Sequence, residues 1–474
     1  MGKPFLNVFE EDEIEAVHAA TLRILGEVGI VLGEPEALKL LLDAGARQQQ
    51  GRLLLPETLV EWALAQCPHT ISLRGRCWSN PPVAGGAITL GGGSLHWHNL
   101  GGARDVFEPK TQSLRSAGVE DVIKAARLLD ALPACTCVTP FFTPQDVPGR
   151  QMSLAMYRHT LPHTTKPVYG PGVQTAAEVR AAVRMAEVVG EPRECLMMAI
   201  SPISPLTFPN HLVGAMLETA RAGVPFGPLP CPTAGATAPL TISGALAQQN
   251  AEVIASIVLV QLVHPGLPVM YCGRLAMMEP RTGASVWGGV ELGLASAGTV
   301  QLAHHYGLPV NVYGFSTNSH ILDLQNGFER AMNALIPALA GADELSGIGE
   351  MAAGSAASYA QMVLDDEIAG SVQRVRRGFA CNEEALAVEV VAAAMDTSHN
   401  FLSEEHTRKH LRAGEILITK LAERGSWSDW EMRGRAGMTE RAQEKAEHLL
   451  SEHRAPVLDA AQEAELDQIL QFAF

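Results

Sequence analysis

Aromatic side chains are concentrated where apolar segments end between Pro133 and Gly378. Aromatic residues make up 5% of the 474-residue chain, yet six of them close such segments: Phe141, Phe142, Tyr169, Tyr271, Tyr313 and Phe315. For any one of these residues, packing in the core is the simpler explanation. Together they predict a cage whose ring faces hold a quaternary ammonium group. Two acidic residues near these positions, Asp323 and Glu350, would add to the attraction for a cation.

A second candidate site is the His-x-His pair formed by His96 and His98 in LHWHNL. In a strand the two imidazoles would point to the same face and could bind a metal ion. A metal hydrolase would also need a later Lys or His and an Asp at strand ends, and the sequence offers no clear set. A hairpin with a polar face therefore explains the pair better, and we expect no tightly bound metal.

Several other functions are disfavoured by the motifs. The chain contains no GxxxxGK[ST] loop, no GxGxxG opening a helix after a strand and no GxSxG elbow, which argues against nucleotide binding and serine hydrolysis. Four cysteines lie in separate apolar runs without a CxxC pair: Cys135, Cys195, Cys231 and Cys272. Free cysteine behaves as a small hydrophobic residue, so we expect buried reduced thiols rather than zinc ligands.

Composition narrows the class of protein further. Hydrophobic residues make up 47% of the chain and charged residues 18%, so a chain of this length can form a large buried core. A net charge of -16 argues against nucleic acid as a partner. The longest apolar stretch, from Ile254 to Val260, is far shorter than the roughly 20 residues of a membrane span, and no leader sequence is recognisable. We therefore expect a cytoplasmic protein that does not enter a membrane.

Strand-like and helix-like segments alternate from Pro133 to Gly378, which predicts an α/β fold of the (β/α)8 TIM-barrel type. Seven strands are clear: PACTCVTPFF, KPVYGPG, CLMMAISPISP, PFGPLPCPTAG, PVMYCGR, PVNVYGFSTNS and ADELSGIGE. Either residues 95–99 or the segment after Gly378 could supply the eighth. In such barrels the site lies at the carboxyl ends of the strands.

The pattern outside the barrel predicts three regions. Residues 1–118 read as an N-terminal helical segment and hairpin cover, with glycine-rich hairpins at 77–107 covering one end of the barrel. Residues 119–396 form the barrel, and residues 397–474 form a C-terminal helical tail packed on it. Trp287, between the fifth strand and its helix, fits a core position or a lid over the barrel mouth equally well.

An ordered set of segments resembles the trimethylamine methyltransferase family over nearly the whole chain. These segments are AQCP, GATAPLT, RTGAS, QLAHHYGLP, STNSHILDLQNGFE, DDEIAGSVQRVRRG and HNFL, with an earlier ILGEVGI and a late GSWSDW. The resemblance implies a (β/α)8 barrel that moves a methyl group from a methylated amine to Co(I) of a separate corrinoid protein. The corrinoid (cobalamin) would be carried by that partner.

The resemblance also shows a departure in one loop. Founding members carry pyrrolysine after the sixth strand, just before a D-S-K-x-x-D-x-Q pattern. Here the loop has ordinary residues, with the equivalent position within Phe315 to Ser316. The family's Asp and Lys correspond to Asn318 and His320, whereas Asp323 and Gln325 match the pattern. The chain therefore resembles a non-pyrrolysine member.

Leaving-group chemistry points the same way. A neutral tertiary amine is a poor methyl donor because it would leave as an amide anion, whereas a quaternary ammonium leaves as a neutral amine. The enzyme would then need only to hold, desolvate and orient the cation, without a catalytic acid or base. We predict a methyltransferase for a small quaternary amine such as a betaine or a carnitine-like compound, acting with a cognate corrinoid protein and as a homo-oligomer.

The predicted substrate site combines three groups of residues. The aromatic cage consists of Tyr169, Tyr271, Tyr313, Phe315 and Phe142, with Asp323, Gln325 and Glu350 nearby. If the substrate carries a carboxylate, its candidate clamps are Arg274, His96, His98 and His320. Three alternatives stay open: a sulfonium methyl donor, a non-catalytic quaternary-cation-binding protein, and a metal-dependent hydrolase using His96 and His98.

Overall fold

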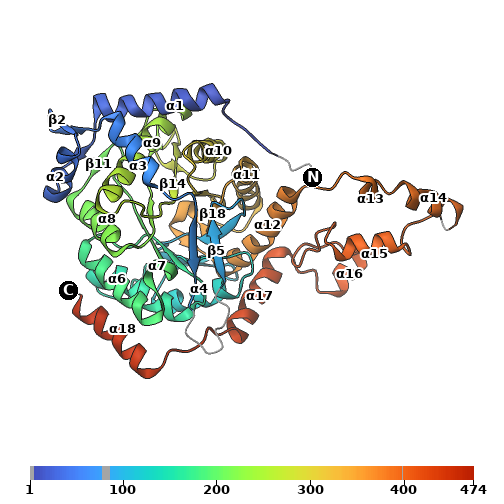
Figure 1. Ribbon diagram of the computed structural model, residues 1–474. Helices are drawn as coiled ribbons and strands as arrows, with labels where there is room; N and C mark the ends of the chain where they lie inside the picture. The colour runs from blue at the N-terminus through green and yellow to red at the C-terminus, as the bar shows by residue number, and fades with distance from the viewer. Residues whose placement is uncertain (1–4, 77–85, 398, 474) are drawn as a thin grey trace.

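Strands and helices alternate from His96 to Arg377 in the computed structural model of the protein (Figure 1). The structure describes residues 5–76, 86–397 and 399–473. Seven parallel strands make up the centre: β6 (His96–Asn99), β9 (Val168–Gly170), β10 (Leu196–Ile200), β12 (Phe226–Pro228), β14 (Tyr271–Gly273), β17 (Val310–Tyr313) and β18 (Glu344–Ile348). They correspond to six of the seven predicted strands and to residues 95–99.

The parallel pairings lead from strand to strand and return to the first. Ladders join β9 to β10, β10 to β12, β14 to β17, β17 to β18 and β18 to β6. Parallel bridges supply the remaining links: Phe226 to Val269, Val138 to Val168, and His98 to Cys137. Residues 137–138, in the first of the predicted strands, therefore stand between β6 and β9. We call these seven strands and residues 137–138 the strand ring.

One helix follows each segment of the strand ring. In chain order these are α4 (Val119–Ala131), α5 (Met152–Thr160), α6 (Ala176–Val189), α8 (Asn210–Ala222), α9 (Ile242–Val263), α10 (Val290–His305), α11 (Leu324–Ala340) and α12 (Tyr359–Arg377). Local signals fix several ends. Thr175 and Glu178 form a capping box at the start of α6, and Gly223 adopts the left-handed conformation that ends α8.

The N-terminal part contains helices and hairpins. Its helices are α1 (Glu11–Arg23), α2 (Pro35–Asp43) and α3 (Glu57–Gln66), and its hairpins are β2 (Arg47–Gln49) with β3 (Arg52–Leu54), β4 (Ile71–Arg74) with β5 (Ala87–Leu90), and β7 (Asp105–Glu108) with β8 (Ser113–Ser116). Alternate residues of the β4–β5 hairpin, among them Ile71 and Leu90, are buried in one cluster with Cys137, Tyr169 and Met197 of the strand ring. The hairpin thus closes one end of the ring interior. Within the predicted hairpin region, residues 77–85 lie outside the described residues.

Short elements complete the surface around the carboxyl ends of the strands. They are β1 (Val31–Leu32), β11 (Thr207–Phe208), β13 (Thr233–Ala234), β15 (Ala276–Met278), β16 (Ser285–Val286), β19 (Glu350–Met351) and β20 (Ala356–Ala357). The short helix α7 (Pro192–Cys195) instead lies directly before β10 and contacts β4 of the hairpin. β13, β15 and β16 form one small sheet, and β19 and β20 join β7 and β8 in another.

Helix α9 is the one helix in the described part of the chain that is long and apolar enough to cross a membrane. It is packed against α1, α3, α8 and α10, and 89% of its most apolar part is buried inside the fold. Such burial is typical of a core helix.

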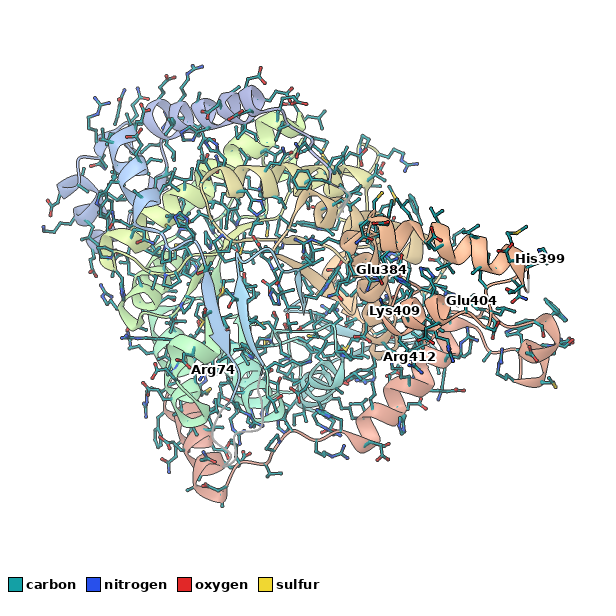
Figure 2. All side chains as sticks on the ribbon, turned by 45° about the vertical axis from the view of Figure 1, so that its right-hand side comes forward. Arg74, Glu384, His399, Glu404, Lys409 and Arg412 are labelled. Atoms are coloured by element: carbon teal, nitrogen blue, oxygen red, sulfur yellow. The ribbon has the colours of Figure 1, made fainter. Side chains whose placement is uncertain are left out.

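The C-terminal part separates into an arm and two packed helices. The arm consists of α13 (Glu383–Leu386), α14 (Val388–Asp396), α15 (Glu405–Arg412) and α16 (Trp427–Met432), and it projects away from the strand ring (Figures 1 and 2). Near its base Lys409 of α15 pairs with Glu384 of α13. α17 (Met438–Glu452) then packs on α12 and α4, and α18 (Ala460–Phe472) packs on α6 and α5.

Candidate active site

A cavity of about 370 Å³ lies at the carboxyl ends of the parallel strands. Side chains from different strands line it, including His98, Tyr169, Cys231, Arg274, Tyr313 and Ser346. Successive residues of a strand point to opposite faces, so alternate residues of each strand reach the interior of the ring. The cavity is therefore built from residues that are far apart in the sequence.

Asn311, in the middle of β17, organises the polar groups beside this cavity. Its Nδ2 donates to Glu344 Oε2 at 2.7 Å and lies 2.8 Å from His98 Nε2. Its Oδ1 accepts a hydrogen bond from Arg274 Nη2. The amide is fully buried and has a partner on each side, so its orientation is fixed by the network.

His98 is neutral in this network. Burial and the nearby Arg274 charge lower the pKa of His98 to about 3. Its Nδ1 lies 2.7 Å from the backbone oxygen of Asn99, and its Nε2 faces the Asn311 amide. These partners assign the hydrogen to Nδ1, which donates to the carbonyl, and leave Nε2 as the acceptor.

Glu344 is a buried carboxyl group with a strongly shifted titration. Burial raises its pKa to about 7, although the Asn311 hydrogen bond and the Arg274 charge oppose that rise. Its Oε2 accepts from Asn311, while its Oε1 is buried without a hydrogen-bond partner among the described residues. The protonated form of this carboxyl therefore persists to a higher pH than that of an exposed glutamate.

Arg274 follows β14 and reaches the cavity beside Tyr313. Its Nη1 donates to the backbone oxygens of Gly273 and Asn311, each at 3.1 Å. Its guanidinium lies 4.7 Å from the centre of the Tyr313 ring, an arrangement in which the ring face attracts the cation. Trp287 meets the same tyrosine edge-on, with ring centres 5.3 Å apart. Trp287 is half-buried, so it is not a core residue.

Tyr169 forms the opposite wall of the cavity. Its Oη lies 3.0 Å from Cys272 Sγ, and its ring meets His98 edge-on at 5.0 Å. Burial raises the pKa of Tyr169 well above its ordinary value, so the phenol stays neutral. Tyr169 and Tyr313 are the two predicted cage residues that line the cavity.

The other predicted cage residues point away from the cavity. Tyr271 donates its hydroxyl hydrogen to Asn250 of α9, and Phe315 stacks on Trp97 with ring centres 4.8 Å apart. Phe142 packs against Phe141 and Tyr359. The structure thus brings Tyr169 and Tyr313 together but places Tyr271, Phe315, Phe142 and Phe141 in the packed layer between strands and helices. In β14 the reason is alternation, since Cys272 and Arg274 face inward and Tyr271 faces outward.

The loop after β17 is held by hydrogen bonds rather than exposed to the cavity. Asp323 is the N-cap of α11 and accepts from the backbone nitrogen of Asn326 at 3.0 Å. Gln325 is exposed and donates to Glu329, and His320 is exposed. Asn318 accepts from the backbone nitrogens of Trp287 and Gly288. These residues lie outside the cavity, and Asp323 has the capping role that its position before a helix allows.

Glu350 lies in a second buried network beneath this loop. Ser316 Oγ and the backbone nitrogen of Thr317 donate to its Oε1 at 2.9 and 3.3 Å. Burial raises the pKa of Glu350 to about 7. Nearby, Arg330 pairs with Asp365 at 2.9 Å, and both side chains have no solvent exposure.

The His-x-His pair does not form a metal centre in the described structure. His96 and His98 both lie on β6, but His96 Nε2 bonds the backbone oxygen of Thr89 in the hairpin that closes the other end. Across residues 5–76, 86–397 and 399–473, no group of three or more His, Cys, Asp or Glu side chains is placed to hold a metal ion. Cys135, Cys195, Cys231 and Cys272 are free thiols.

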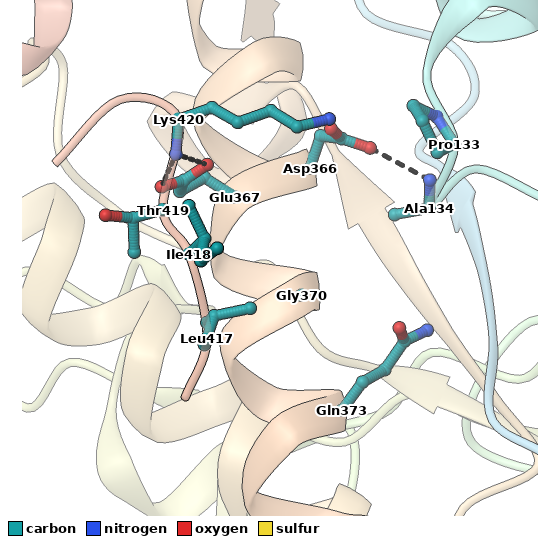
Figure 3. Close-up of a pocket in the computed structure, with 10 residues that line it drawn as sticks. All are labelled: Pro133, Ala134, Asp366, Glu367, Gly370, Gln373, Leu417, Ile418, Thr419 and Lys420. Carbon is teal, nitrogen blue, oxygen red and sulfur yellow. Dashed lines mark hydrogen bonds between the residues drawn. The ribbon is translucent and has the colours of Figure 1, made fainter. Parts of the chain in front are cut away.

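Among the larger recesses outside this cavity, two lie close to the strand ring. One of about 850 Å³ shares Gly101 and Pro171 with it and includes Arg150, Ser153 and Gln174, so it opens directly beside the cavity. The other, of about 630 Å³, lies between α12, residues 133–134 and residues 417–420. Figure 3 shows that Asp366 and Glu367 there accept hydrogen bonds from the backbone of Ala134 and Lys420. This recess shares no lining residue with the cavity.

Comparison with known proteins matches residues 1–471 to the family model "Trimethylamine methyltransferase (MTTB)". The chain belongs to the trimethylamine methyltransferase family. It is 32% identical over 471 residues to trimethylamine methyltransferase MttB of Desulfitobacterium hafniense (strain DSM 10664 / DCB-2), covering 98% of this chain and 93% of the relative. It is 28% identical over 481 residues to glycine betaine methyltransferase of Desulfitobacterium hafniense (strain Y51), covering 98% and 97%.

Membership of the trimethylamine methyltransferase family confirms the predicted resemblance and shows that the protein is a methyltransferase. It supports methyl transfer from a methylamine or a quaternary amine, with a corrinoid partner implied by the family. Among solved structures, Methanosarcina barkeri monomethylamine methyltransferase (MtmB) is similar, with a TM-score of 0.51 at 12% identity over 94% of this chain and 89% of that one. That likeness concerns the α/β fold alone.

Two residues of the cavity network, Asn311 and Glu344, were not among the predicted site residues. Asn311 is the one polar residue in the apolar run PVNV, and Glu344 lies beside Asp343 in the strand segment ADELSG. A polar group in a buried strand needs a hydrogen-bond partner, and this signal identifies both positions.

Proposed function

We propose that the protein transfers a methyl group from a small quaternary amine to Co(I) of a corrinoid protein. The observation that carries this proposal is the chemistry of the cavity wall. Its polar and aromatic lining residues are two tyrosines, a neutral histidine, an arginine, a cysteine, a serine, a threonine and an asparagine. None of these is an electrophile that could form a covalent adduct with a neutral amine. A methyl donor that enters this cavity must therefore already be cationic.

The reaction needs little from the protein beyond binding and exclusion of water. The N–CH3 bond breaks with its electron pair remaining on nitrogen, and the leaving group is a neutral tertiary amine. The cobalt supplies the electron pair that forms the new Co–C bond. Tyr169 and Tyr313 would hold the ammonium group, and the recess that shares Gly101 and Pro171 with the cavity would let the acceptor approach.

We also infer that the strand ring and its eight helices are a (β/α)8 barrel. The closed series of parallel pairings and the helix after each segment support this inference. On this basis β6 belongs to the barrel, the β4–β5 hairpin precedes it, the β7–β8 hairpin follows it, and the tail begins after α12. The exposed apolar side chains of the arm, including Leu402 and Trp427, fit the proposed homo-oligomer, and a cytoplasmic location fits the buried α9.

The proposal is tested by methyl transfer to free Co(I) cobalamin under anaerobic conditions. Purified protein is mixed with glycine betaine, carnitine, choline, a sulfonium analogue or trimethylamine, and methylcobalamin is followed by its absorption spectrum. We expect turnover with at least one quaternary amine and none with trimethylamine. Binding without transfer for every compound would favour the non-catalytic cation-binding protein, and preferred turnover of the sulfonium would favour the sulfonium donor.

A further inference from the structure

Arg274 is a buried cation whose charge is not met by a carboxylate at ion-pair distance. It is 4% exposed, and its hydrogen bonds run to two backbone oxygens and the Asn311 amide, which are all neutral. Within the described residues no acidic side chain forms an ion pair with it, and its Nε donates to none of their atoms. A buried charge is costly unless it is paired, so this arrangement calls for an anionic partner.

The buried carboxyl group that is linked to Arg274 through Asn311 is not a full counter-charge. Glu344 reaches Arg274 through Asn311, which accepts from the guanidinium and donates to Glu344 Oε2. Because Glu344 is fully buried with one oxygen lacking a described partner, its charged form is disfavoured. The positive charge on Arg274 therefore remains largely uncompensated on the side that lines the cavity.

We propose that Arg274 binds a carboxylate of the substrate and so selects zwitterionic methyl donors over simple quaternary cations. This inference rests on the proposed function and specifies its substrate. A simple quaternary cation would add a second positive charge to a cavity that already holds the guanidinium. A zwitterion brings the negative charge that Arg274 lacks and the quaternary nitrogen in the same molecule, and an arginine side chain can bind a carboxylate through two parallel hydrogen bonds.

The structure separates Arg274 from the three other predicted clamps. His320 is exposed on the loop before α11, outside the cavity. His96 bonds Thr89 of the β4–β5 hairpin at the opposite end of the ring interior. His98 faces the cavity, but both of its ring nitrogens already have partners. Of the four predicted clamps, only Arg274 both lines the cavity and carries a permanent positive charge.

Isothermal titration tests this proposal without requiring turnover. Glycine betaine and tetramethylammonium, which share the quaternary nitrogen, are titrated into the wild type, Arg274→Gln and Arg281→Gln. Arg281 is the matched control because it lies seven residues away, is 85% exposed and pairs with Glu279. We expect Arg274→Gln to bind glycine betaine about 10- to 100-fold more weakly, which is the range of a hydrogen bond to a charged group.

The remaining arms separate this inference from the proposed function. Tetramethylammonium should bind Arg274→Gln as tightly as the wild type or more tightly, and Arg281→Gln should match the wild type throughout. Equal weakening of both ligands, or wild-type preference for tetramethylammonium, would overturn the clamp even if methyl transfer is observed. If Arg274→Gln loses affinity for glycine betaine alone, the clamp is supported even if free cobalamin proves a poor methyl acceptor. Arg274→Lys keeps the positive charge, so it should bind glycine betaine more tightly than Arg274→Gln does.

Discussion

Two buried networks in this protein contain an arginine and a carboxyl group, but they are completed differently. Beneath the loop after β17, Arg330 contacts Asp365 directly at 2.9 Å, and neither is exposed. Beside the cavity, Asn311 stands between Arg274 and Glu344. The first network neutralises its own cation and supports the loop, whereas the second leaves a cation facing an open cavity. The difference suggests that an incomplete buried network marks a ligand site and a complete one marks a structural support.

Breaking the complete network should have the largest effect on stability. Arg330→Met leaves the Asp365 carboxylate buried without its cation, which typically costs about 3 to 5 kcal/mol. Urea unfolding monitored by circular dichroism measures this loss. Arg281→Met removes an exposed arginine instead and should change the unfolding free energy by less than about 0.5 kcal/mol. A cost below about 1 kcal/mol for Arg330→Met would mean that the pair does not support the fold.

The titration of Glu344 should make stability depend on pH. Burial raises the pKa of Glu344 from its ordinary value of 4.5 to about 7. Between these values the folded state holds a proton that the unfolded state has released, so this group's contribution to stability falls as pH rises from about 4.5 to about 7. Glu344→Gln cannot lose a proton, so it should lose about 1 to 3 kcal/mol less than the wild type over this range. Parallel pH profiles of the unfolding free energy for both proteins would contradict the assignment.

Supplying the missing carboxylate should convert the incomplete network into a complete one. Asn311→Asp places a carboxylate in contact with Arg274, where it competes with the carboxylate of the substrate. We expect glycine betaine to bind about tenfold more weakly, which corresponds to about 1.4 kcal/mol. Titration calorimetry measures the affinity, and near-ultraviolet circular dichroism checks that the fold is retained. A folded variant that binds glycine betaine as tightly as the wild type does would show that Arg274 does not bind the carboxylate of the substrate.

The smallest effect is expected at the start of α11. Asp323→Ala removes the cap on the backbone nitrogen of Asn326, and such losses cost about 1 kcal/mol. Asp323→Asn keeps a capping oxygen while losing the charge, so it should retain both stability and activity. Unfolding free energies and methyl transfer rates of the two variants decide the point. A large loss of activity in a stable Asp323→Asn protein would give the charge a function beyond capping.

The sequence was sufficient to predict the elements that recur along the chain. Apolar runs separated by helical segments identified the parallel strands, and one of the two candidate eighth segments, residues 95–99, proved to pair with β18. The position of Asp323 before a predicted helix indicated helix capping as one of two alternative roles, and Asp323 is the N-cap of α11. These predictions succeed because periodicity and capping are local properties of the chain.

The cavity could be predicted only in part because strand register is not local. Tyr271 and Arg274 both lie in the segment PVMYCGR, yet only Arg274 faces the cavity. A shift of one residue along a strand moves a side chain to the opposite face of the sheet. The closing segments of β9 and β17 place Tyr169 and Tyr313 inward, whereas Phe315, two residues beyond the end of β17, turns to stack on Trp97. The pairing of Asn311 with Glu344 and Arg274 arises from three separate strands, so no spacing in the sequence reveals it.

The most direct test of the account is a competition between two methyl donors in one reaction. Equal concentrations of glycine betaine and trimethylamine are incubated with the purified protein and Co(I) cobalamin, and the demethylated products are identified by mass spectrometry. The account predicts dimethylglycine together with methylcobalamin, and no dimethylamine. Formation of dimethylamine without dimethylglycine would contradict it.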